Sequence, residues 1–134
     1  MQIRFLTLAE VLQIYADQVR RRGGAIGVRD PNGLLSALAM PEAGVGGERF
    51  HSFPWGMAAA YAFHLCRNHP FVDGNKRVAL AAALIFLVLN GVRIEDPESV
   101  LFGTMVGVAE GRVSKSEFAD LLAKLAENGL PPTS

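Results

Sequence analysis

The side chains with the clearest chemical capacity lie in one segment, HPFVDGNKR, at residues 69–77. His69 has an imidazole that can accept a proton near neutral pH. Asp73, four residues later, has a carboxylate of the kind that binds Mg²⁺ through oxygen. Lys76 and Arg77 add two cations suited to phosphate oxygens. This combination predicts a site at which a general base, a metal-binding carboxylate and phosphate-binding cations act on one ligand.

The same segment directly precedes an apolar run, residues 78–89, which is too short to span a bilayer and predicts a buried central helix beginning near Asn75. The first N–H groups of a helix lack internal partners and carry the positive end of the helix dipole. Gly74 allows a tight turn, and Phe71 is expected to anchor the loop on the core. Gly74, Asn75 and the two cations are therefore predicted to bind an anion, most naturally a phosphate. Each residue alone also has an ordinary explanation, such as a capping role for Asp73, and only the combination favours a site.

Helix start and stop signals elsewhere predict an all-α fold, a compact bundle of about six helices. Thr7 and Glu10 form a capping box, and Gly23 follows the end of the helix that they begin. Ser114 and Glu117 form a second capping box. The predicted helices cover approximately residues 8–22, 34–40, 54–68, 75–90, 96–111 and 114–128.

Composition excludes several classes of protein. Half of the 134 residues are apolar and 19% are charged, which supports one domain over residues 1–128, with a disordered tail at 129–134. The formal net charge is zero, so no general attraction to nucleic acid is expected. The only cysteine, Cys66, rules out an internal disulfide framework and a zinc site with four thiolate ligands. No signal peptide or membrane span is recognised, and a cytoplasmic protein is expected.

Three further features allow two interpretations each. Arg20, Arg21 and Arg22 fall in the last turn of the first predicted helix, where cations suit the helix dipole, but they could also contact phosphate or an acidic partner. His64 lies on the helix before the motif and is interpreted as a packed or solvated side chain rather than a ligand. Trp55 could anchor the start of that helix or border the site.

The segment HPFVDGNKRVAL resembles the motif of Fic-domain proteins, His-x-Phe-x-Asp-Gly-Asn followed by Gly-Arg or Lys-Arg. This version is similar to that of the Doc branch, the "death on curing" toxins of bacterial and phage toxin–antitoxin modules. The likeness covers about residues 3–125 and includes the flanking residues Gly27-Val28-Arg29-Asp30, Asn68 and Asn90-Gly91.

The resemblance implies a role for each matched position of the motif. It assigns His69 the deprotonation of the target hydroxyl and Asp73 the positioning of Mg²⁺. It implies that Gly74 and Asn75 form an anion-binding turn and that Arg77 binds the nucleotide phosphates.

Two positions depart from the adenylyltransferase form of the Fic motif. Lys76 stands where that form has a second glycine, and Leu80 stands where it has a second arginine. In the Doc branch the same changes accompany a reversed nucleotide, which implies transfer of the γ-phosphate of ATP to a threonine of elongation factor Tu, with Mg²⁺ as cofactor. Lys76 is therefore counted with the catalytic and the nucleotide-binding residues. The alternatives are a Fic-type adenylyltransferase and a non-catalytic module that keeps the phosphate site to bind a partner.

The Gly- and Pro-rich loop at residues 41–54 matches the position of the Fic flap, which pairs with an extended target segment by adding a strand. The resemblance therefore predicts a docking edge formed by Glu48, Arg49, Phe50, His51 and Ser52. The other interpretation is an ordinary loop with Phe50 and Phe53 packed into the core.

The chain lacks the sequence spacing of an inhibitory helix of its own, a Ser or Thr followed four residues later by Glu and then Gly or Asn. Val106 stands four residues before Glu110, and Ala123 stands four residues before Glu127. By resemblance, a small Phd-like antitoxin is expected to inhibit the protein in trans. Its disordered tail is expected to fold as an amphipathic helix in a groove of the bundle.

Overall fold

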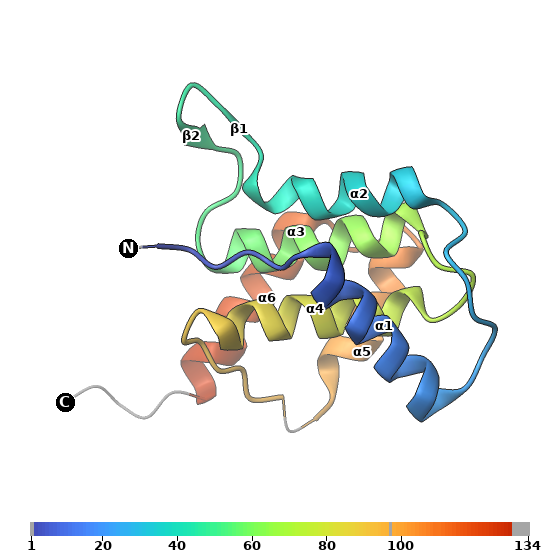
Figure 1. Cartoon of the computed structure of the whole chain (residues 1–134). Helices are drawn as coiled ribbons and strands as arrows, with labels where there is room; N and C mark the ends of the chain where they lie inside the picture. The colour runs from blue at the N-terminus through green and yellow to red at the C-terminus, as the bar shows by residue number, and fades with distance from the viewer. Residues whose placement is uncertain (1, 97, 130–134) are drawn as a thin grey trace.

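The computed structural model describes residues 2–96 and 98–129, and within that part the chain forms a helical bundle (Figure 1). The helices are α1 (Leu8–Arg22), α2 (Pro31–Ala39), α3 (Trp55–Asn68), α4 (Asn75–Leu89), α5 (Val100–Ala109) and α6 (Lys115–Gly129). A 3-10 turn, η1 (Met40–Glu42), and two short strands, β1 (Gly44–Val45) and β2 (Glu48–Arg49), connect α2 to α3. The prediction of an all-α bundle is confirmed. Of the predicted disordered tail, residues 130–134 lie outside the described residues.

Both predicted capping boxes are present. The Glu10 N–H donates to Thr7 Oγ1 at 3.1 Å, and the Thr7 N–H donates to Glu10 Oε1 at 2.9 Å. At the start of α6, the Glu117 N–H donates to Ser114 Oγ at 3.0 Å, and the Ser114 N–H donates to Glu117 Oε1 at 2.9 Å. These short-range patterns fix the beginnings of α1 and α6 because each side chain bonds a backbone group within its own first turn.

Two helices begin elsewhere than predicted. α2 begins at Pro31, three residues before the predicted start, because Asp30 caps it by accepting from the Gly33 N–H at 2.9 Å. α5 begins at Val100, later than the Asp96 start that was predicted, and Pro97 of that signal lies outside the described residues. The Asp96 carboxylate still caps α5, since it accepts from the N–H groups of Val100 and Leu101 at 2.8 and 3.0 Å.

The centre of the bundle is the antiparallel pair α3–α4. α3 packs against α2, α4, α5 and α6, and its small buried side chains let α4 approach closely. The buried residues of α4 are Asn75, Val78, Ala79, Ala82, Ala83, Phe86 and Leu87. Ile85, Val88 and Leu89, near the end of α4, remain exposed. Within the residues that the structure describes, no helix is long and apolar enough to cross a membrane.

The β1–β2 hairpin and the motif segment lie at opposite ends of α3 (Figure 1). The hairpin pairs Gly44 with Arg49 and Val45 with Glu48, and it precedes α3. The motif segment follows α3 and runs into α4. Because a helix of 14 residues is about 21 Å long, α3 separates the two regions by most of the length of the bundle.

Candidate functional site

The loop between α3 and α4, residues 69–74, is fixed on the core by its apolar anchor and by a buried amide. Phe71 is fully buried and stacks on Tyr15, with ring centroids 4.1 Å apart and planes 14° apart. Asn75 Oδ1 accepts from the Phe71 N–H at 2.9 Å, and Asn75 Nδ2 donates to the Phe71 carbonyl at 2.9 Å. The Asn75 side chain thus closes the loop, and both ends of its amide are occupied by Phe71. The group of Asn75 that can bind an anion is therefore its backbone N–H.

A segment from the α1–α2 connection holds the other side of the loop. Val28 pairs with Phe71 in an isolated antiparallel bridge, and the Val72 N–H donates to the Gly27 carbonyl at 2.9 Å. The Arg29 N–H donates to the Pro70 carbonyl at 2.7 Å. Sequence reasoning cited these residues for family likeness but did not predict this pairing, because the partners are more than 40 positions apart.

His69 caps the C-terminus of α3 in a left-handed conformation, with φ 51° and ψ 53°. Such a conformation costs a residue other than glycine about 1–3 kcal/mol and is found at functional sites. The Arg29 guanidinium secures it by donating to the carbonyls of His69 and Asn68 at 2.9 and 3.3 Å. The backbone of His69 is therefore fixed while its imidazole stays exposed and available for proton transfer.

The turn at Asp73 and Gly74 joins the loop to α4. Asp73 Oδ1 accepts from the Gly74 N–H at 2.8 Å, and Gly74 takes a positive φ of 79°. The first helical hydrogen bond of α4 runs from the Val78 N–H to the Gly74 carbonyl at 3.0 Å. In the described part of the chain, the N–H groups of Asn75, Lys76 and Arg77 have no partner, so the positive end of the α4 dipole opens at this turn.

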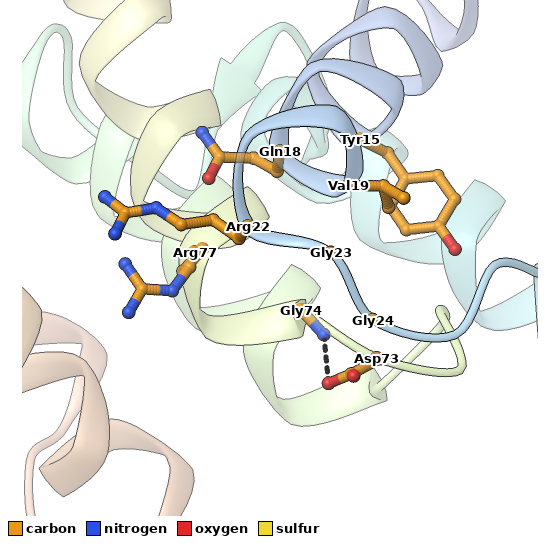
Figure 2. Close-up of a pocket in the computed structure, with 9 residues that line it drawn as sticks. All are labelled: Tyr15, Gln18, Val19, Arg22, Gly23, Gly24, Asp73, Gly74 and Arg77. Atoms are coloured by element: carbon orange, nitrogen blue, oxygen red, sulfur yellow. Dashed lines mark hydrogen bonds between the residues drawn. The ribbon is translucent and has the colours of Figure 1, made fainter.

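The end of α1 approaches the same turn. Gly24 has a positive φ of 107°, which favours glycine, and a Cβ atom on it would lie 2.8 Å from Oδ2 of the exposed Asp73 side chain. Figure 2 shows Gly23 and Gly24 passing beside Asp73 and Gly74. The end of α1 and the two glycines that follow it therefore belong to the surroundings of the motif.

Cavities flank the turn on two sides. One, of about 240 Å³, is lined by Cys66, His69, Val72, Asp73, Gly74, Asn75, Lys76, Arg77, Phe102 and Ala109. The other, of about 190 Å³, is lined by Tyr15, Gln18, Val19, Arg22, Gly23, Gly24, Asp73, Gly74 and Arg77 (Figure 2). Asp73, Gly74 and Arg77 border both cavities. The structure thus brings all the predicted motif residues to one place and adds groups from α1 and α5.

Arg77 contacts an aromatic ring, and among the described residues it has no carboxylate partner. Its guanidinium carbon lies 4.4 Å from the centroid of the Phe102 ring of α5, a cation–π distance. Cys66 lines the larger cavity but is buried, and burial raises the pKa of its thiol, which keeps it protonated. Arg77 therefore keeps its charge available for a ligand, whereas Cys66 agrees with its interpretation as a small buried residue.

The predicted docking edge, Glu48 to Ser52, is not brought to the motif. It lies before α3, at the far end from His69, and in the described part of the chain its strand pairs with β1 alone. Phe50 is 64% exposed, while Phe53 packs against the core, so the ordinary-loop interpretation agrees for Phe53 and not for Phe50. Trp55 also lies at that end, where it packs at the start of α3.

A second group of basic side chains, called here the histidine cluster, consists of His51, His64 and Lys115. Lys115 Nζ lies 3.1 Å from His64 Nε2, and the two imidazole rings are 6.4 Å apart. Burial, with Lys115 and His51 nearby, lowers the pKa of His64 to about 4. Since an ammonium group only donates, neutral His64 accepts from Lys115 at Nε2. The interpretation of His64 as a packed residue agrees with this arrangement, and among the described residues no group of three or more His, Cys, Asp or Glu side chains could hold a metal.

The comparisons with known proteins agree with the motif. Residues 5–87 match the model of the Fic/DOC family. The chain is 35% identical to "Protein kinase doc" of Escherichia phage P1 over 124 residues, which are 92% of this chain and 96% of that protein. It is 49% identical to "Toxin Doc" of Mycolicibacterium smegmatis over 72 residues, which are 54% of this chain and 55% of that protein.

Proposed function

Because this chain belongs to the Fic/Doc family, we propose that it is a Doc-type toxin that transfers the γ-phosphate of ATP to a hydroxyl group of a protein. The proposed target is a threonine of a translation factor such as elongation factor Tu, so that the reaction blocks translation. The observation that carries the proposal is the turn at residues 69–77, which places an exposed imidazole, a carboxylate and two cations at the open N-terminus of α4. The match to a protein kinase over 92% of the chain supports the same reaction.

In the proposed mechanism, His69 acts as the general base. Its imidazole takes the proton of the target hydroxyl while the oxygen forms a bond to the γ-phosphorus. The bond between that phosphorus and the bridging oxygen breaks, and ADP leaves with the electron pair. Lys76, Arg77 and the free N–H groups of α4 border the cavity that His69 also lines, where they would stabilise the charge that develops on the phosphate oxygens.

Asp73 fits a magnesium ion that is carried by the nucleotide. Mg²⁺ usually keeps several waters and takes one or two carboxylates together with substrate phosphates. One exposed carboxylate at the turn, next to the free N–H groups of α4, matches that need. Bound there, the ion would neutralise charge on the phosphate oxygens.

The proposed antitoxin would cover a groove between α1, α4 and α5. A hollow of about 270 Å³ is lined by Gln18, Arg22, Arg77, Leu80, Ala81, Leu84 and Phe102. Ile85 and Val88 are exposed and follow Ala81 and Leu84 along the same face of α4 at helical spacing. An amphipathic helix of a partner laid on this face would bury the apolar side chains and also block Arg77. Inhibition in trans is thus compatible with the surface that the bundle leaves open.

The test of the reaction uses purified protein, Mg²⁺, elongation factor Tu and ATP labelled at either the α- or the γ-phosphate. γ-Label on the factor supports the proposed kinase. α-Label would show adenylyl transfer instead, and no label from a protein that binds ATP would favour a non-catalytic module. The His69→Ala variant serves as the control for contaminating kinases.

The antitoxin is tested by expression in a bacterium, alone and together with the adjacent small open reading frame. Growth arrest that co-expression relieves, with a complex that co-purifies, is the expected result. Harmless expression of a catalytically active protein without any partner would contradict the toxin–antitoxin assignment.

A further inference from the structure

The three arginines that end α1 differ in their surroundings. Asp17 pairs with Arg20 at 2.6 Å and with Arg21 at 3.3 Å. Arg22 has no carboxylate partner in the part of the chain that the structure describes, and it lines the cavity beside the motif turn together with Asp73 and Arg77. The sequence left open whether this basic run serves the helix dipole or a phosphate, and the structure separates Arg22 from its neighbours.

Arg22 and Arg77 line the same two cavities. Both line the cavity of about 190 Å³ and the adjoining hollow of about 270 Å³. Figure 2 shows the two guanidinium groups pointing the same way, away from Asp73. Leu80 lines the adjoining hollow as well and offers no charge there. The lining of this hollow thus has two guanidinium groups and no acid, which favours an anionic ligand.

We infer that Arg22 is a second arginine that binds the polyphosphate chain of the nucleotide. The transferred phosphate lies in the cavity of His69 and Lys76, and the remaining phosphates cross the turn into the cavity of α1. Arg77 borders both cavities and contacts the chain between them. This inference rests on the proposed kinase function, and it adds a binding group from outside the motif.

The shape of the α1 cavity favours a phosphate chain over an apolar ligand. Gly23 and Gly24 present backbone without side chains to it, and the Gly74 turn forms the facing wall. The guanidinium group can donate to two phosphate oxygens at once, which a lysine ammonium does less well. We therefore expect an arginine at position 22 to bind nucleotide more tightly than a lysine does.

The experiment measures the binding of Mg·ATP, tripolyphosphate and adenosine by calorimetry. Arg22→Ala should weaken the binding of ATP and of tripolyphosphate about tenfold and leave adenosine unchanged, since it removes a charge-assisted hydrogen bond. Arg22→Lys should fall between the wild type and the alanine variant. Arg21→Ala is the matched control, because it removes the same charge one residue earlier from a side chain paired with Asp17, and it should stay within about twofold of the wild type.

Kinetics supply a second readout. Arg22→Ala should raise KM for ATP by the same factor while kcat stays close to the wild-type value, because His69 and Asp73 are untouched. If the wild type binds ATP and Arg22→Ala binds it equally well, the inference is wrong and the proposed kinase stands. Equal losses of ATP affinity in Arg21→Ala and Arg22→Ala would show a long-range effect of positive charge rather than a contact of Arg22 with the phosphates. That result would also overturn the inference. A wild type that neither binds ATP nor transfers phosphate would overturn the proposed function and this inference together.

Discussion

The motif turn and the histidine cluster use the same types of residue in opposite ways. At the turn, His69 and Lys76 are exposed beside a cavity, and the backbone around them is fixed by hydrogen bonds and by a positive φ. In the histidine cluster, His51 is buried with Nδ1 unpartnered among the described residues, and Lys115 is hydrogen-bonded to His64. Residue type alone therefore does not distinguish the exposed histidine of the proposed site from a packed one.

The electrostatic consequence follows from burial. Desolvation lowers the pKa of His51, His64 and Lys115, which disfavours their charged forms. The positive charges at the turn face solvent and the N-terminus of α4, where an anion can reach them. The turn is suited to binding and proton transfer, whereas the cluster joins α3 to α6.

The largest expected effect separates the two kinds of histidine. His69→Ala should lower phosphate transfer by a factor of about 10²–10⁴, because it removes the general base, and should leave the melting temperature nearly unchanged since the side chain is exposed. His64→Gln, in the cluster, should keep wild-type transfer. The measurement is label transfer from γ-labelled ATP at saturating substrate. Undiminished transfer by a folded His69→Ala protein would remove the proposed base.

The second prediction compares two arginines that both lie over aromatic rings. Arg77 lies 4.4 Å from the ring centroid of Phe102, and Arg49 of the hairpin lies 5.3 Å from that of Phe5. Arg77→Ala should weaken ATP binding about fiftyfold, since it removes charge-assisted hydrogen bonds to phosphate. Arg49→Ala should leave ATP binding unchanged, because the hairpin lies at the other end of α3. Equal losses in both variants, measured by calorimetry, would contradict this division.

Features that depend on neighbouring residues could be predicted from the sequence, whereas contacts between distant segments could not. Capping boxes at Thr7 and Ser114 were predicted correctly because each involves groups within one turn of helix. The motif residues were predicted as neighbours because they are neighbours in sequence. The contact of Gly27 and Arg29 with the loop was missed, since it depends on how α1 and α2 return to the end of α3.

The docking edge and Arg22 both show that separation along the sequence does not predict distance in the fold. The loop with Phe50 and His51 precedes the motif in sequence, but the straight helix α3 carries the motif away from it. Arg22 is 47 positions before His69, but α1 ends beside the motif turn. The position of each segment along the chain does not show its distance from the motif, because that distance depends on how the helices pack.

The third prediction compares two asparagines that each bridge backbone groups. Asn75 is 5% exposed and bonds both backbone groups of Phe71, whereas the more accessible Asn90 bonds both backbone groups of Arg4. Asn75→Ala should lower the free energy of unfolding by about 2 kcal/mol, since it leaves buried groups unpartnered. Asn90→Ala should cost about 1 kcal/mol, because water can replace its bonds. Urea unfolding measures both, and an equal or reversed order would contradict the role of Asn75 as the lock of the loop.

The smallest expected effect concerns pH and belongs to the histidine cluster. Burial lowers the pKa of His64 from 6.5 to about 4, so between these values the unfolded chain binds a proton that the folded chain does not. The free energy of unfolding should therefore be fully retained above pH 6.5 and should fall as the pH drops towards 4. Because His64 is only half-buried, screening by solvent limits its contribution to the loss of unfolding free energy to about 1 kcal/mol.

The test compares urea unfolding of the wild type and His64→Gln at several values between pH 6.5 and 4.5. Glutamine keeps an acceptor for Lys115 but has no proton to gain, so the variant should lose less stability across this range. His51, whose pKa burial also lowers, contributes with the same sign and should leave a smaller slope in the variant. If the free energy of unfolding falls equally with pH in the two proteins, His64 is already solvated in the folded state. The cluster would then differ from the motif turn in position alone, and burial would no longer distinguish His64 from the proposed base, His69.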